Sequence, residues 1–228
     1  MTVQAVAAAI DHTALKPTLT TRAIAQLCEE AVLYQFAAVC VPPCYVKMAC
    51  ELLQGTPIAV ATVIGFPLGY STTETKEAEI NEALHNGATE IDVVHNISFI
   101  KSGDEAHATR EIEVLTQQVH ARGGRIKVIL ETSYLTDAEI VACCRQYGAL
   151  GVDFVKTSTG FSDAGAQVEH VRLMRQSLPD TIRIKASGGI RTLAEAQAML
   201  AAGADRLGTS AGVQIISEMT APGETLTT

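Results

Sequence analysis

Short aliphatic runs alternate with longer amphipathic segments along almost the whole chain. The short runs are rich in β-branched residues and comprise residues 8–10, 38–41, 58–64, 91–94, 126–130, 154–155, 182–184 and 206–208. The amphipathic segments between them comprise residues 21–34, 73–85, 104–122, 137–147, 166–178 and 192–202. Thr192 and Glu195 have the spacing of a capping box, and Gly87 and Gly203 follow the ends of two segments. This alternation predicts repeated strand–helix units around a parallel sheet.

The number of units decides between the two architectures that share this alternation, a doubly wound open sheet and a closed barrel. Eight short runs occur, no G-x-G-x-x-G motif follows the first of them, and no linker divides the chain. The length of 228 residues fits one (β/α)8 barrel, which typically has about 250 residues. We therefore expect an α/β protein with a single TIM-barrel domain over residues 1–228. A short lead-in at 1–7 and a tail at about 214–228 would flank the barrel.

Composition and charge narrow the classes of partner. Hydrophobic residues make up 47% of the chain and charged residues 18%, which supplies a large core. Lys and Arg total 17 against 25 Asp and Glu, a net charge of −8 without any basic run, which argues against nucleic acid or an anionic membrane as a partner. The first basic residue, Lys16, lies after the apolar stretch 3–10, unlike a signal peptide. We expect a cytoplasmic protein whose six cysteines are reduced.

Charged residues interrupt strands that should be apolar on both faces. Asp92 lies in E-I-D-V-V, Lys127 in R-I-K-V-I, Lys156 in D-F-V-K-T and Lys185 in R-I-K-A-S. Side chains alternate between the two faces of a strand, so each lysine lies opposite an aliphatic neighbour. If the aliphatic residues face the helices, the lysines point into the barrel. The alternative is that each lysine lies at a strand end and extends to solvent.

Two inward lysines on neighbouring strands would disfavour each other's charge. Repulsion between the ammonium groups and partial burial both lower a lysine pKa. A change from ~10.4 to ~7 takes roughly 4.6 kcal/mol, which desolvation and a nearby cation can supply. A neutral amine is what imine formation with a carbonyl substrate requires. The spacing leaves the nucleophile open among Lys127, Lys156 and Lys185.

Small residues follow the last three predicted strands. The loops are T-S-T-G at 157–160, S-G-G at 187–189 and G-T-S-A-G at 208–212. Such loops let backbone N–H groups approach an anion, and barrels often hold phosphate after strands 7 and 8. Any one of them also makes an ordinary turn. Three on consecutive strands predict a phosphate site.

Seven segments resemble the signatures of the deoxyribose-phosphate aldolase family, in the order of that family and from about residue 10 to residue 213. They are IDHTALKP at 10–17, VCVPP at 39–43, VIGFPLG at 63–69, EIDVV at 90–94, VKTSTGF at 155–161, IKASGGIR at 184–191 and RLGTSAG at 206–212. The resemblance implies a class I aldolase that needs neither a metal nor another cofactor. It implies reversible cleavage of 2-deoxy-D-ribose 5-phosphate to D-glyceraldehyde 3-phosphate and acetaldehyde, so a phosphorylated sugar and aldehydes are the expected partners.

The resemblance also implies roles for individual residues. Lys156 matches the lysine that forms the Schiff base, Lys185 matches a second lysine that perturbs it and takes part in proton transfer, and Asp92 matches the acid–base carboxylate. The residues that match the substrate site are Asp11, Thr13, Cys40 and Thr157, although Cys40 is equally compatible with a packed thiol in the core. The residues that match the phosphate site are Gly160, Ser187, Gly188, Gly189, Gly208 and Ser210. No tyrosine follows Gly212, so no role of a C-terminal aromatic residue carries over.

Several residues and functions stay open. His12 is expected on the barrel exterior, His95 either alters the acid–base network or faces solvent, and Glu131 either pairs with Lys127 or holds a loop. The alternative function is a sugar-phosphate isomerase, or another phosphate-binding barrel lyase, with Asp92 or Glu131 as base. A metal-dependent aldolase would need a His cluster at the strand ends, and the chain has none there. A homodimer through helical faces is compatible with such a barrel.

Overall fold

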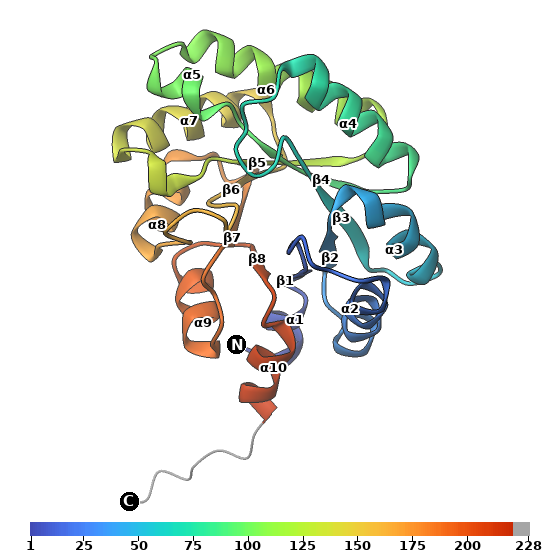
Figure 1. Ribbon diagram of the computed structural model, residues 1–228. Coiled ribbons are helices and arrows are strands. Elements are labelled where there is room, and N and C mark those ends of the chain that lie inside the picture. Colours follow the sequence, from blue (N-terminus) through green and yellow to red (C-terminus); the bar gives the residue numbers. More distant parts are fainter. Residues whose placement is uncertain (221–228) are drawn as a thin grey trace, which may run out of the picture.

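The computed structural model describes residues 1–220 and closes eight parallel strands into one barrel (Figure 1). The strands are β1 (Ile10–Thr13), β2 (Ala38–Val41), β3 (Ala59–Ile64), β4 (Glu90–Val94), β5 (Arg125–Ile129), β6 (Phe154–Lys156), β7 (Arg183–Ser187) and β8 (Arg206–Thr209). Each strand pairs with its neighbours in sequence, and β1 pairs with β8 to close the ring. The predicted TIM barrel is confirmed. The part of the expected tail beyond residue 220 lies outside the described residues.

Helices alternate with the strands and form the outer ring (Figure 1). They are α1 (Val3–Ala7), α2 (Thr21–Tyr34), α3 (Val46–Leu52), α4 (Thr73–His85), α5 (Ile97–Lys101), α6 (Glu105–Ala121), α7 (Asp137–Leu150), α8 (Val168–Ser177), α9 (Leu193–Ala201) and α10 (Gly212–Thr220), with short 3₁₀ turns η1 (Pro43–Tyr45) and η2 (Thr132–Tyr134). Thr136 and Thr192 each form a capping box at the start of a helix, as the sequence predicts for Thr192. Among the described helices, none is long and apolar enough to cross a membrane.

Some boundaries differ from the prediction, and the reasons are physical. The first strand spans Ile10–Thr13 instead of residues 8–10. It starts later because Ala8 caps the end of α1, and it extends further because its polar residues ended the apolar run in the sequence. Up to residue 220, the segment expected as a tail from about 214 forms part of α10, which buries Ile215 and Ile216. The expected lead-in 1–7 contains α1, which packs against α10. Helices this short span few turns and show no clear period in the sequence.

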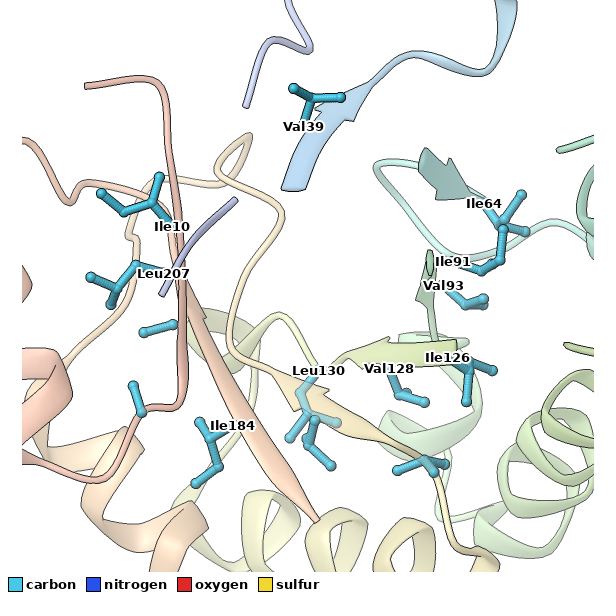
Figure 2. Packing of buried hydrophobic residues seen from close by; sticks show 14 of the residues in the cluster. Ile10, Val39, Ile64, Ile91, Val93, Ile126, Val128, Leu130, Ile184 and Leu207 are labelled. Atoms are coloured by element: carbon cyan, nitrogen blue, oxygen red, sulfur yellow. The ribbon is translucent and has the colours of Figure 1, made fainter. Parts of the chain in front are cut away.

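Alternate strand residues form an aliphatic shell between the barrel and its helices. Figure 2 shows members of this shell along the strands, among them Ile10, Val39, Ile64, Ile91, Val93, Ile126, Val128, Leu130, Ile184 and Leu207. All of these side chains are fully buried. Burial of one such side chain contributes about 1.5–3 kcal/mol, so the shell supplies much of the energy that holds the helices on the barrel.

The intervening strand residues face the barrel interior. A small apolar cluster on β2 and β3 occupies one side and consists of Cys40, Ala61 and Val63, with Leu15 and Phe66 packed against it. The inward residues of β4 to β8 and of β1 are mainly charged. Buried charges are costly unless they are paired, so this half of the interior points to chemistry instead of packing.

Candidate active site

Seven charged side chains meet inside the barrel, and we call them the interior charge cluster. They are Asp11 on β1, Glu90 and Asp92 on β4, Lys127 on β5, Lys156 on β6, Lys185 on β7 and Arg206 on β8. All are buried, and the strand register places Lys156 beside Lys185 and Asp92 beside Lys127. The predicted inward orientation of the lysines is confirmed, and the alternative in which they extend to solvent is wrong.

Asp92 contacts all three lysines of the cluster. Its Oδ2 accepts hydrogen bonds from Lys156 Nζ and from Lys185 Nζ, each at 2.8 Å. Its Oδ1 accepts a hydrogen bond from Lys127 Nζ at 2.8 Å. Two amino groups therefore share one carboxylate oxygen, while the third lysine holds the other oxygen in place.

The remaining carboxylates distinguish Lys156 from the other two lysines. Lys185 Nζ also donates to Asp11 Oδ2, and Lys127 Nζ lies 2.6 Å from Glu90 Oε2. Lys185 thus bridges two carboxylates, and Lys127, which also lies 3.6 Å from Asp11 Oδ2, contacts three. Within the described residues, Lys156 contacts the carboxylate of Asp92 alone. It is the least stabilised cation of the three.

The pKa values follow these contacts. Burial lowers the pKa of Lys156 below its usual value, and its single carboxylate partner offsets this only in part. Burial also opposes the charge on Lys185 and Lys127, but their carboxylate partners outweigh it and raise both pKa values. Burial disfavours the charge on Asp92 as well, yet the surrounding lysines hold its pKa well below the usual range. Lys156 is therefore the lysine that most readily loses its proton.

The charge balance of the cluster leads to the same assignment. Three carboxylates face four buried basic side chains, so this buried set is neutral when one base gives up its proton. Arg125 also contacts Glu90, but its side chain is exposed to solvent. The Arg206 guanidinium stays charged, and Lys127 has three carboxylates and Lys185 two to hold their charge. A net charge in a buried, low-dielectric site is strongly disfavoured. A neutral Lys156 removes it.

A cavity of about 420 Å³ opens at the C-terminal ends of β1, β6, β7 and β8. The predicted site residues that line it are Thr13, Lys156, Gly160, Ser187, Gly188, Gly189, Gly208 and Ser210. Three strands from the end of the chain and one from its beginning therefore meet around the Lys156 amino group. This is the face on which TIM barrels carry out their chemistry.

Glycines let the backbone and a lysine come close to this cavity. Gly160, Gly188 and Gly189 have φ angles of +84°, +89° and +81°, a region that disfavours a side chain. Gly208 serves a different purpose, because a Cβ there would lie 3.0 Å from Lys185 Cε. Its missing side chain makes room for Lys185 within the barrel.

Five predicted site residues do not line the cavity, and one of them, Lys185, belongs to the interior charge cluster. Asp11 and Asp92 belong to this cluster as well. Thr157 joins β6 to β7, since its hydroxyl donates to Ser187 O at 3.2 Å and accepts from Ser187 N at 3.1 Å. Cys40 is fully buried in the small apolar cluster, and burial raises the pKa of its thiol.

Two histidines lie outside the barrel interior. His12 packs toward α2, as expected, where its Nε2 lies 2.7 Å from Glu30 Oε2. His95 is fully buried and contacts the Tyr147 hydroxyl at 2.9 Å and the Leu130 carbonyl at 2.8 Å. Burial lowers the pKa of His95 to about 3, so the ring is neutral. Both expectations for His95, a place in the acid–base network and exposure to solvent, are wrong.

Two basic residues that line the cavity were missed by reasoning from the strands. Lys16 follows β1 and Arg191 follows β7, and neither forms an ion pair with a carboxylate of residues 1–220. Both occur in segments that carry the family resemblance, which was the available signal. No group of three or more His, Cys, Asp or Glu side chains suited to a metal ion occurs in the described part of the chain.

The sequence of this chain also matches a known protein family over nearly its whole length. The model of the DeoC/LacD family aldolases matches residues 5–218. The chain belongs to this family. The interior charge cluster and the cavity thus lie within a recognised aldolase barrel.

Individual members of the family are similar over nearly the whole chain. The deoxyribose-phosphate aldolase of Thermoanaerobacter sp. (strain X514) is 52% identical over 93% of this chain and 96% of its own. A solved structure of a candidate deoxyribose-phosphate aldolase from Coccidioides immitis has a TM-score of 0.92 at 44% identity, covering 96% of this chain and 87% of the other. The tetrameric deoxyribose phosphate aldolase of Aeropyrum pernix has a TM-score of 0.90 at 32% identity, covering 96% and 93%.

Proposed function

We propose that this chain catalyses the reversible cleavage of 2-deoxy-D-ribose 5-phosphate to D-glyceraldehyde 3-phosphate and acetaldehyde. The reaction proceeds through a Schiff base on Lys156. The observation that carries the proposal is a buried lysine of lowered pKa that lines a cavity and shares an oxygen of Asp92 with Lys185. Relatives at 52% and 50% identity that carry the name deoxyribose-phosphate aldolase support the choice of substrate.

Lys156 begins the reaction as a nucleophile. Its neutral amine attacks C1, the aldehyde carbon of the open-chain sugar, and loss of water leaves a protonated imine. The imine nitrogen carries positive charge next to C1, so it can accept the electron pair of the C2–C3 bond. The lowered pKa of Lys156 matters here because an ammonium group has no lone pair for the attack.

Bond cleavage requires a base for the hydroxyl proton on C3. As that proton leaves, C3 becomes a carbonyl carbon, the C2–C3 bond breaks, and its electron pair converts the imine to an enamine. Asp92 accepts the proton directly or through a water molecule, with Lys185 bonded to the same oxygen. D-Glyceraldehyde 3-phosphate departs. A proton then returns to C2, and hydrolysis of the imine releases acetaldehyde and restores the amine.

The loops after β6, β7 and β8 are proposed to hold the phosphate group. The residues are Gly160, Ser187, Gly188, Gly189 and Ser210, which line one cavity with Lys156. Small residues and left-handed glycines allow backbone N–H groups to approach a phosphate oxygen. Lys16 and Arg191 supply local positive charge, which offsets the repulsion that a chain of net charge −8 exerts on an anion.

Reduction of the imine with borohydride in the presence of acetaldehyde tests the proposal. We expect the mass of the intact protein to increase by one ethyl group, and peptide mapping to place that group on Lys156. Lys156→Ala and Lys156→Arg should lose both the adduct and turnover. Lys101→Met is the matched control, because Lys101 is a surface residue paired with Glu139. An isomerase would form no adduct, and an adduct on Lys127 or Lys185 would contradict the assignment.

We further propose that the protein is a cytoplasmic homodimer. Helices α2 and α3 expose Val32, Leu33 and Leu52, and Leu33 is 74% exposed. The six cysteines are unpaired, which suits a reducing compartment. Sedimentation equilibrium should give twice the chain mass of 24.1 kDa, and Leu33→Glu should give the monomer. A wild-type monomer, or a dimer unaffected by Leu33→Glu, would speak against this surface.

A further inference from the structure

Glu131 lies immediately after β5 and has an unusual conformation. Its φ is +52°, and only one other non-glycine residue within 1–220 has a positive φ. A side chain disfavours this backbone region, so other contacts must hold the residue there. The Glu131 side chain is buried, and no basic side chain of the described residues lies within ion-pair distance of it. Its carboxylate is therefore stabilised by something other than a cation.

Three donors from the loop between β6 and α8 satisfy this carboxylate. Thr159 donates its backbone N–H to Glu131 Oε2 at 3.1 Å, and its hydroxyl donates to the same oxygen. The Ser162 hydroxyl donates to Oε1 at 2.9 Å and accepts from the Ser133 hydroxyl at 3.0 Å. Hydrogen bonds to an ionised acceptor are stronger than neutral ones. The carboxylate thus fixes the first half of a loop that has no helix or strand of its own.

That half of the loop is a wall of the cavity. Thr159, Gly160 and Phe161 all line it, whereas Glu131 does not. The Thr159 hydroxyl also accepts a hydrogen bond from Phe161 N at 3.0 Å. One buried acceptor therefore determines where the backbone on both sides of Gly160 lies.

The second half of the same loop is attached to the phosphate loop after β7. Ala166 N donates to Gly188 O at 3.0 Å. A Cβ on Gly165 would lie only 2.1 Å from that same oxygen, so the two backbones are in direct contact. A shift of the β6–α8 loop away from Glu131 would therefore also move the phosphate loop at Gly188.

We propose that Glu131 is a positioning residue that sets the affinity for the phosphate end of the substrate. It does so by holding the β6–α8 loop in register with Gly188, and it touches neither the sugar nor Lys156. The inference rests on the proposed function, since it concerns a phosphorylated substrate. Glu131 would thus affect binding of the phosphate group without affecting the chemistry at the Lys156 amine.

Steady-state kinetics with and without the phosphate group test this role. In Glu131→Ala, KM for 2-deoxyribose 5-phosphate should rise about tenfold or more, the effect expected for loss of a hydrogen bond to a charged group. The kcat value and the KM for free 2-deoxyribose should stay close to wild type. The acetaldehyde adduct on Lys156 should form at the wild-type rate. Glu131→Gln keeps one oxygen acceptor for the loop and should give an intermediate KM.

Variants on the loop side keep the test decisive if Glu131→Ala folds poorly. Ser162→Ala removes one donor and leaves the carboxylate, so it should raise the same KM by a smaller factor. In the double variant with Glu131→Gln, Ser162→Ala should raise this KM by a smaller factor than it does in the wild-type protein, because both changes affect one contact. Glu139→Gln is the control, since Glu139 is a surface carboxylate that caps α7.

The outcomes separate this inference from the proposed function. An equal rise in KM for both sugars, or a slower adduct on Lys156 in Glu131→Gln, would overturn the positioning role. If Glu139→Gln raised KM for the phosphorylated sugar selectively and by the same factor as Glu131→Gln, the positioning role would be overturned as well. A wild-type protein that forms no adduct with acetaldehyde would instead overturn the proposed function, from which the positioning role derives.

Discussion

Replacement of Lys127 by methionine should make Lys156 harder to deprotonate. Lys127 lies on the far side of Asp92 from Lys156 and contacts Asp92 Oδ1 at 2.8 Å and Glu90 Oε2 at 2.6 Å. It does not line the cavity at the C-terminal strand ends, so its removal leaves the substrate contacts in place. Without its charge, the three carboxylates of the interior charge cluster face three bases. The cluster is then neutral only if Lys156 keeps its proton.

The size of the effect follows from the distance between the two amino groups. Lys127 and Lys156 bond opposite oxygens of one carboxylate, so their nitrogens lie roughly 5–7 Å apart. At an effective dielectric constant of about 20, the repulsion at this distance is about 2–3 kcal/mol. Its loss shifts the equilibrium between amine and ammonium about 30- to 150-fold toward the ammonium. At acid pH, where the ammonium form dominates, kcat/KM should fall by that factor.

The pH dependence of kcat/KM is the assay, supported by the rate of borohydride-trapped adduct formation at each pH. The acid limb of Lys127→Met should move to higher pH, and activity should return to within a few-fold of wild type at alkaline pH. Lys127→Arg keeps the positive charge, so the acid limb of its kcat/KM profile should stay at the wild-type pH. Thermal unfolding checks the fold, since removal of one partner from a buried ion pair costs about 3–5 kcal/mol. A loss that is uniform across pH would refute the charge-balance argument.

Three further predictions concern other parts of the molecule. Lys16→Met should raise KM for the phosphorylated sugar about three- to tenfold with little change in kcat, and an equal change for free 2-deoxyribose would contradict a phosphate contact. Gly189→Leu places a side chain at φ +81° beside the cavity and should raise the same KM far more than that for the free sugar; equal losses would count against the phosphate assignment. The fold favours neutral His95, whose pKa is about 3 against 6.5 in the unfolded chain. Stability should be complete above pH 6.5 and fall by up to about 1.4 kcal/mol per pH unit toward pH 3 in urea titrations, and His95→Gln should remove that slope.

The alternation of residue types predicted that the strand lysines could point into the barrel, but it did not single out Glu90 or Arg206. The aliphatic residue that precedes each of Lys156 and Lys185 places the lysine on the other face of the strand, and a closed barrel leaves the interior as that face. The partners of these lysines were not predictable in the same way. Lys185 contacts Asp11 across a separation of 174 residues, which depends on closure of β8 onto β1.

The loops were less predictable than the strands, because they have no period that relates one residue to the next. Lys16 and Arg191 lie in such loops, and their place at the cavity depends on three-dimensional backbone paths. The two alternatives for Glu131 were equally compatible with the sequence until the coordinates of the β6–α8 loop distinguished them. The family resemblance, not the spacing, selected Lys156 from among three candidate lysines.

Closure of the barrel between β1 and β8 has a consequence for the order of events during synthesis. Asp11 is one of the two carboxylates that stabilise the Lys185 ammonium, and it emerges from the ribosome near the start of synthesis. Arg206, which also donates to Asp11, emerges near the end of synthesis. Until the last strand docks, Lys156 is open to water and carries the proton of an ordinary surface lysine. A nascent or truncated chain therefore reacts with aldehydes only as an ordinary lysine does, and the lowered pKa of Lys156 arises once the ring is complete.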